Sequence, residues 1–252
     1  MQEERYQLLQ ELSLAVAASL PKPRFYRDFP DALRRSDALL ADDGMVRQCR
    51  GKLDASLLEC AHGLCHCEAV ARDAGALVLI EGGGRSLPAA ELASLAEAAV
   101  IAGLLHDIKR REEDHAVRGS IEAERILSEV GMDARRRGYV SYAIRNHEAF
   151  KAVCDLGDEA GCLVSDALYD ADKFRWGPEN FTTTLWTMVK DRGTTPEHLH
   201  VVFPEKMKGI KQIKSTFRTA TGRAYGPEII DQGIEIGNAI YREMSLMLKN
   251  DL

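Results

Sequence analysis

A histidine and an aspartate stand side by side, as His106 and Asp107, at the end of an apolar stretch with the sequence GLLHDI. An ionised carboxylate is costly to bury unless it is paired or bound to a metal ion. An imidazole and a carboxylate can bind one divalent ion together when other segments supply the remaining ligands. The dipeptide alone is a weak signal for a metal site, so the residues that accompany it elsewhere in the chain decide its meaning.

Further residues that could bind metal follow in an ordered series. His66 lies 40 residues before His106, and His115 lies nine residues after it. His147 follows His115 by 32 residues, and Asp172 follows His147 by 25. This order of a histidine, a His-Asp pair, two histidines and a late aspartate resembles the HD superfamily of metal-dependent phosphohydrolases. The two additional histidines resemble those of its dinuclear members.

The resemblance implies an enzyme that hydrolyses a nucleotide or another small phosphate ester with a metal-activated water. It implies two divalent ions as cofactors, and histidine and carboxylate ligands suit iron, manganese, zinc or nickel. The implied ligands of the first ion are His66, His106, Asp107 and Asp172. The second ion would take His115 and His147, with Asp107 shared between the two. Basic residues near these motifs are expected to neutralise the charge that builds up on the phosphoryl group, namely Lys109, Arg110, Arg145 and Lys173.

Two of these ligands have a competitor close by in the sequence. The segment HCEAV, which begins at His66, resembles the first HD motif, in which a valine follows the histidine by four residues. His62 lies one helical turn earlier on the same face and remains the alternative. Asp172 has Leu168 one turn before it and Trp176 one turn after it, so its face is expected to be buried.

Asp170 is the competitor of Asp172. It shares its helical face with Asp166 and Lys173, which predicts a solvated position. A buried carboxylate is the costlier residue to keep, so Asp172 is the predicted ligand. Removing Asp170 is expected to leave the metal content nearly unchanged and to change stability within about ±0.5 kcal/mol.

The motifs depart from those of the dinuclear cyclic-di-GMP branch of the family. Lys109 stands where that branch has a glycine, and no Gly-Tyr-Pro motif follows His147. Asn146 takes the place of the first histidine in a paired step. Two rival functions remain open: a mixed-valent di-iron oxygenase of the same superfamily, and a degenerate HD fold that binds a ligand without catalysis.

The pattern of apolar residues predicts an all-α protein, because helical periodicity recurs and no sheet-forming alternation of any length is present. We expect an HD-type helical core at 51–180, with an N-terminal helical extension at 1–50 and a C-terminal one at 181–252. Within the core, predicted helices span 52–74, where Gly75 would end the first, and 89–108. A final amphipathic helix is predicted to start at Gly226-Pro227.

Composition restricts the partners. The chain has 252 residues and a net charge of −6, so it lacks the basic footprint of a duplex nucleic-acid binder. It contains no run of ~18 apolar residues, so no membrane is expected. The acidic N-terminus MQEE differs from a basic secretory signal, and a cytoplasmic location is predicted. A homodimer remains open.

For three remaining sequence features, a structural role is the first interpretation and a functional role is the alternative. Four of the six cysteines lie close together without a C-x-x-C pair, which favours thiols that pack between helices over a metal cluster: Cys49, Cys60, Cys65 and Cys67. The glycines at 82–84 indicate a surface loop, because no Lys-Ser/Thr pair follows as in a P-loop. Lys211, Lys214 and Arg218 form a basic stripe, either solvated or part of a lid over substrate phosphates.

Overall fold

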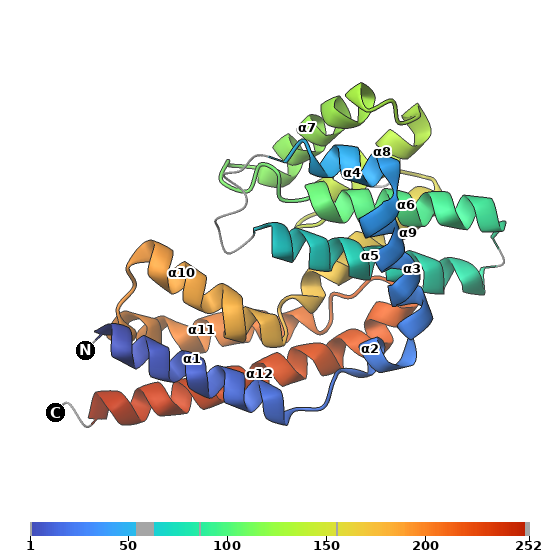
Figure 1. Ribbon diagram of the computed structural model, residues 1–252. Coiled ribbons are helices and arrows are strands. Elements are labelled where there is room, and N and C mark those ends of the chain that lie inside the picture. Colours follow the sequence, from blue (N-terminus) through green and yellow to red (C-terminus); the bar gives the residue numbers. More distant parts are fainter. Residues whose placement is uncertain (1, 54–62, 86, 155, 250–252) are drawn as a thin grey trace.

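The computed structural model describes residues 2–53, 63–85, 87–154 and 156–249 and shows an all-α fold, with no strand in these ranges (Figure 1). The prediction of the fold class is confirmed. The first half of the chain forms α1 (Gln2–Ser19), α2 (Arg24–Asp28), α3 (Pro30–Asp42), α4 (Gly44–Arg50), α5 (Leu64–Gly84) and α6 (Ala89–Leu105). The second half forms α7 (His115–Glu129), α8 (Ala134–Arg145), α9 (Glu159–Phe174), the π-helical turn η2 (Asn180–Thr184), α10 (Leu185–Arg192), α11 (Pro196–Ile213) and α12 (Ala220–Lys249).

The helices form two layers (Figure 1). In one layer α5 packs against α6 and α9, α8 packs against α9 and α7, and α3 and α4 cover α5 and α6. In the other layer, α12 lies beside α1 and α11, and α10 follows η2. The residues of the predicted N-terminal extension are thus divided, because α1 packs on the C-terminal helices and α3 packs on the core. Among the described helices, none is long and apolar enough to cross a membrane.

Helix α6 lies at the centre of the first layer. Its residues from Leu95 to Leu105 are almost all buried, which fits a stretch that is apolar all round. Gly103 allows α6 to approach α5 closely, because a Cβ there would lie 2.4 Å from the Cα of Ala71. The helix ends two residues before Asp107 and so delivers the His-Asp pair from a tightly fixed position.

The prediction that Gly75 ends a helix is wrong. Helix α5 continues through Gly75 to Gly84, and the part of the predicted helix at 54–62 lies outside the described residues. The glycine serves close packing instead of termination. A Cβ at Gly75 would lie 2.3 Å from the Oγ of Ser36 and 2.6 Å from a methyl carbon of Val100.

The predicted start of the last helix at Gly226-Pro227 is also wrong, because α12 begins at Ala220 and contains Pro227. The two residues just before this helix are held by Asp170 of α9. The Asp170 carboxylate accepts hydrogen bonds from the backbone N–H groups of Arg218 and Thr219, each at 2.8 Å. A side chain distant in the sequence therefore supplies the acceptor that the start of α12 needs.

Gly103→Ala is expected to destabilise the protein by about 1–3 kcal/mol, because the new methyl group meets backbone atoms of α5 that cannot rotate away. Chemical denaturation measures the change. Gly209→Ala is the matched control: it lies inside α11 with nothing within 4 Å of the added Cβ, so it should be neutral or stabilise by up to about 1 kcal/mol. Equal stabilities for Gly103→Ala and the wild type would contradict this account of the α5–α6 contact.

Candidate metal centre

The fold brings all six predicted ligands together from five segments of the chain. They lie on the first turn of α5, directly after α6, at the start of α7, directly after α8 and near the end of α9: His66, His106 with Asp107, His115, His147 and Asp172. Five of them are at most 8% exposed. His115 is partly buried, and its side chain is 12% exposed.

The first group of donor atoms belongs to His66, His106, Asp107 and Asp172. The Nε2 atoms of the two histidines are 3.3 Å apart. An Asp172 oxygen lies 3.5 Å from Nε2 of His66 and 3.8 Å from Nε2 of His106. The Oδ2 atom of Asp107 lies 3.6 Å from Nε2 of His106. Two imidazole nitrogens and two carboxylate oxygens therefore face one point.

The second group comprises Asp107, His115 and His147. The Nε2 atoms of the two histidines are again 3.3 Å apart. The Oδ1 atom of Asp107 lies 3.8 Å from Nε2 of His115 and 3.6 Å from Nε2 of His147. Asp107 thus presents one oxygen to each group. A carboxylate in this position can bridge two cations, so both His/Asp groups could hold metal ions.

Hydrogen bonds at the rear of the imidazole rings fix two of the histidines. Nδ1 of His106 lies 2.8 Å from the carbonyl oxygen of Gly103, and Nδ1 of His147 lies 2.6 Å from that of Ile144. A carbonyl only accepts, so each Nδ1 must carry the proton. In the neutral ring the lone pair is then on Nε2, which faces the centre. This is the tautomer that a metal ligand needs.

Carboxylates stand behind the other two histidines. Glu179 lies 3.8 Å from Nδ1 of His66, and Glu148 lies 4.0 Å from Nδ1 of His115. Such carboxylate–histidine pairs orient metal ligands and raise their basicity. Sequence analysis missed Glu179; its one local signal was its position one helical turn after Arg175, whose guanidinium donates to it at 2.9 Å.

The histidines and the aspartate of the first group differ in charge. Burial lowers the pKa of His66, but hydrogen bonds to Asp172 and Glu179 outweigh burial and raise it to about 9. Burial lowers the pKa of His106 to about 4 and keeps that ring neutral. Burial alone would raise the pKa of Asp172, but Lys173 and the histidines hold it well below its usual value. At neutral pH the group therefore pairs a protonated His66 with the ionised Asp172 beside a neutral His106, and a cation bound by His66 would displace its proton.

The four predicted basic residues occupy different environments. Arg110 contacts both groups: its Nη1 atom is 2.8 Å from Nε2 of His115, and its Nε atom is 3.8 Å from Oδ2 of Asp107, the oxygen that faces the first group. Lys173 is buried and donates to Asp172. Lys109 forms an ion pair with a surface glutamate at 3.2 Å. Arg145 is exposed at the end of α8 and forms no ion pair with a described residue.

The expectation that Asp170 faces solvent is wrong. Its side chain is 0% exposed and also accepts a hydrogen bond from the hydroxyl group of Thr219 at 2.7 Å. Burial raises its pKa to about 6, although the hydrogen bonds from Arg218 and Thr219 oppose this. The pattern of α9 alone could not show that α12 packs against this face. Asp172 lies two residues further along the chain, and its carboxylate faces His66 and His106 instead.

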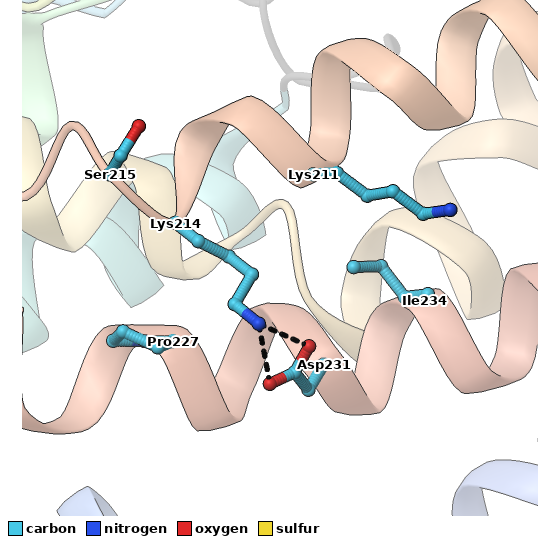
Figure 2. A pocket seen from close by; sticks show the side chains of 6 residues that line it. All are labelled: Lys211, Lys214, Ser215, Pro227, Asp231 and Ile234. Carbon is cyan, nitrogen blue, oxygen red and sulfur yellow. Dashed lines mark hydrogen bonds and ion pairs between the residues drawn. The ribbon is translucent and has the colours of Figure 1, made fainter.

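The remaining sequence features lie away from the centre or outside the described residues. His62 and Cys60 fall in the latter class. Among described residues, the groups that could hold a metal contain histidine and aspartate but no cysteine. In the basic stripe, Lys214 forms an ion pair with Asp231 of α12 at 2.8 Å, and Figure 2 shows it turned toward that helix. Arg218 lies 3.6 Å over the ring of Tyr169.

Comparison of the chain with protein-family models, curated proteins and solved structures finds no match. The case for a metal centre rests on the geometry of its side chains.

Asp172→Ala is expected to remove at least one equivalent of metal, because it deletes a charged ligand of the first group. Asp170→Ala is the matched variant on the same helix. It should keep its metal but lose about 1–3 kcal/mol of stability, because buried N–H groups at the start of α12 lose their acceptor. Elemental analysis and denaturation check both variants. Loss of metal from Asp170→Ala alone would overturn the assignment of Asp172.

Arg110→Gln is expected to raise the affinity of the second group for Mn²⁺ by about tenfold. The guanidinium donates to the lone pair of His115 that an ion must use, and its charge opposes a cation there. Calorimetric titration measures this affinity, with Arg118→Gln as the control, since that exposed arginine pairs with Glu112 instead. An unchanged second affinity in Arg110→Gln would show that Arg110 does not compete with the ion.

Proposed function

We propose that this chain is a metal-dependent phosphohydrolase that uses two divalent ions on a nucleotide or another small phosphate ester. The observation that carries the proposal is the pair of His/Asp groups that share Asp107. A structural ion would need only one closed set of ligands. Two adjacent groups joined by a carboxylate suit the in-line displacement at phosphorus that two-metal sites assist.

The donor set fits the expected ions. Four imidazole nitrogens and two carboxylates suit Mn, Fe, Zn or Ni better than Ca or Mg, which prefer oxygen ligands throughout. Each histidine has a carbonyl or carboxylate oxygen behind its ring, as metal-binding histidines do: Gly103, Ile144, Glu179 and Glu148. Ions held there would supply Lewis acidity toward a phosphoryl group and lower the pKa of a water molecule.

Arg110 is the residue best placed to bind the substrate. Its side chain is 38% exposed and lies at the edge of the second group, beside Asp107 and His115. A planar guanidinium binds two phosphoryl oxygens at once and stays charged at all relevant pH values. Moving from His115 to the phosphoryl group would let it neutralise charge on the substrate and leave the His115 nitrogen available.

Lys173 has a different role in this proposal. It is 3% exposed, and its ammonium group donates to one oxygen of Asp172 and lies 5.1 Å from the centre of the Tyr169 ring. The other oxygen of Asp172 faces the histidines. Lys173 therefore keeps Asp172 ionised and oriented, while contact with substrate falls to Arg110.

The proposal is tested with Mn²⁺- or Fe²⁺-loaded protein and a panel of bis(p-nitrophenyl) phosphate, p-nitrophenyl phosphate and nucleotides, by measuring product release. Asp107→Asn should lower the rate more than about 100-fold, because losing a shared ligand exceeds the 10–100-fold typical of an outer partner. Asp191→Asn, on an exposed aspartate of α10, is the control. No hydrolysis of any ester, together with oxygen uptake on a diol or phosphonate, would favour the oxygenase instead.

A further inference from the structure

A cavity of about 530 Å³ lies among α2, α3, α5, the end of α9 and α12. It adjoins the metal centre through Glu179, which lines the cavity and also stands behind His66. None of the six predicted metal ligands lines it. Its volume is in the range of pockets that bind small molecules.

The cavity combines apolar walls with converging cations. Phe174, Leu33 and Ile229 contribute to the walls. Four basic side chains reach it from four segments, and they outnumber the two carboxylates of the lining, Asp37 and Glu179. These basic residues are Lys22, Arg34, Arg72 and Arg175. The charged groups can fix one end of a ligand while the apolar walls contact its body.

A buried network holds two of these arginines in place. Arg175 is 9% exposed and donates to the carboxylate of Asp73 and the hydroxyl group of Tyr26. Arg72 donates through Nε to the other oxygen of Asp73 at 3.1 Å. Asp73 is 0% exposed, so this buried carboxylate anchors two arginines of the cavity lining.

This network uses only part of the hydrogen-bonding capacity of Arg72. Arg72 uses only Nε in hydrogen bonds with the described residues, and its side chain is 34% exposed. Its two terminal amino groups therefore have no acceptor among those residues. Lys22 likewise forms no ion pair within the described ranges. Two cationic groups at the mouth of an apolar pocket are suited to a phosphate or carboxylate group.

Glu179 connects the cavity to the first metal group. One of its oxygens accepts a hydrogen bond from Arg175 at 2.9 Å, and the other lies 3.8 Å from Nδ1 of His66. An anion that approaches Arg175 competes with Glu179 for the guanidinium. Glu179 would then shift its contact with His66, and the affinity of the first group for its ion would change.

We propose that this cavity binds a small molecule with an anionic phosphoryl or carboxyl group on an apolar body, and that its occupancy is coupled to the metal centre through Arg175 and Glu179. Coupling between two binding sites is reciprocal, so metal must change the affinity for the anion by the same factor. The site is separate from the proposed hydrolysis, and its binding test stands even if no ester is cleaved.

Binding is tested by calorimetry with phenylphosphonate and with benzoate, which supply the two anionic groups on one apolar ring. Arg72→Gln should weaken binding of the better ligand by about tenfold or more. Lys22→Gln, on an exposed residue of the same lining, should weaken it too and does not disturb the buried network. Arg135→Gln, on an exposed arginine of α8 beside Tyr139, should bind like the wild type.

A control with metal-free protein separates binding in the cavity from binding of the anion to a metal ion. The metal-free protein should still bind the ligand, and Arg72→Gln and Lys22→Gln should still weaken that binding. Binding that vanishes without metal, or that neither variant weakens, would overturn the site. Coupling is read from the Mn²⁺ affinity, which should change several-fold in saturating ligand and should not change in Glu179→Gln. If the Mn²⁺ affinity of the wild-type protein is the same with and without saturating ligand, the proposed coupling is wrong.

Discussion

The carboxylate of Asp107 is the group on which the centre depends. It is 3% exposed, and each of its oxygens faces the Nε2 atoms of a different set of histidines. The Nε2 atoms of His66 and His106 lie 3.3 Å apart, as do those of His115 and His147, so each pair must share a proton or a cation. The α5–α6 contact at Gly103 fixes the backbone from which this carboxylate projects.

The support for the centre extends well beyond its ligands. Backbone carbonyls at the ends of α6 and α8 set two imidazole rings, and Glu179 stands behind a third. Glu179 is held in turn by Arg175, which also bonds to Tyr26 on α2. The N-terminal segment therefore helps to support the candidate metal centre. A chain of charged and hydrogen-bonded groups links it to His66, whose pKa is raised to about 9 by Asp172 and Glu179.

Helical periodicity and the order of the histidines and aspartates sufficed to predict an all-α fold and a set of candidate ligands that the structure gathers in one place. The local sequence pattern gave wrong predictions at residues whose environment is set by a helix distant in the sequence. Gly75 resembles a helix end but allows Ser36 to approach, and Asp170 resembles a surface residue but holds the start of α12. Glu179 belongs to no sequence motif, because its role depends on a contact with Nδ1 of His66, which is distant in the sequence.

The most direct measurement is anomalous diffraction from crystals of the Mn²⁺-loaded protein. The account predicts two peaks, about 3.5–4 Å apart as in two-metal sites, with Asp107 between them. One peak would be bound by His66, His106 and Asp172, and the other by His115 and His147. A single peak held only by the first set, with His115 and His147 turned away, would contradict the two-ion centre. No peak at either set would contradict the metal centre itself.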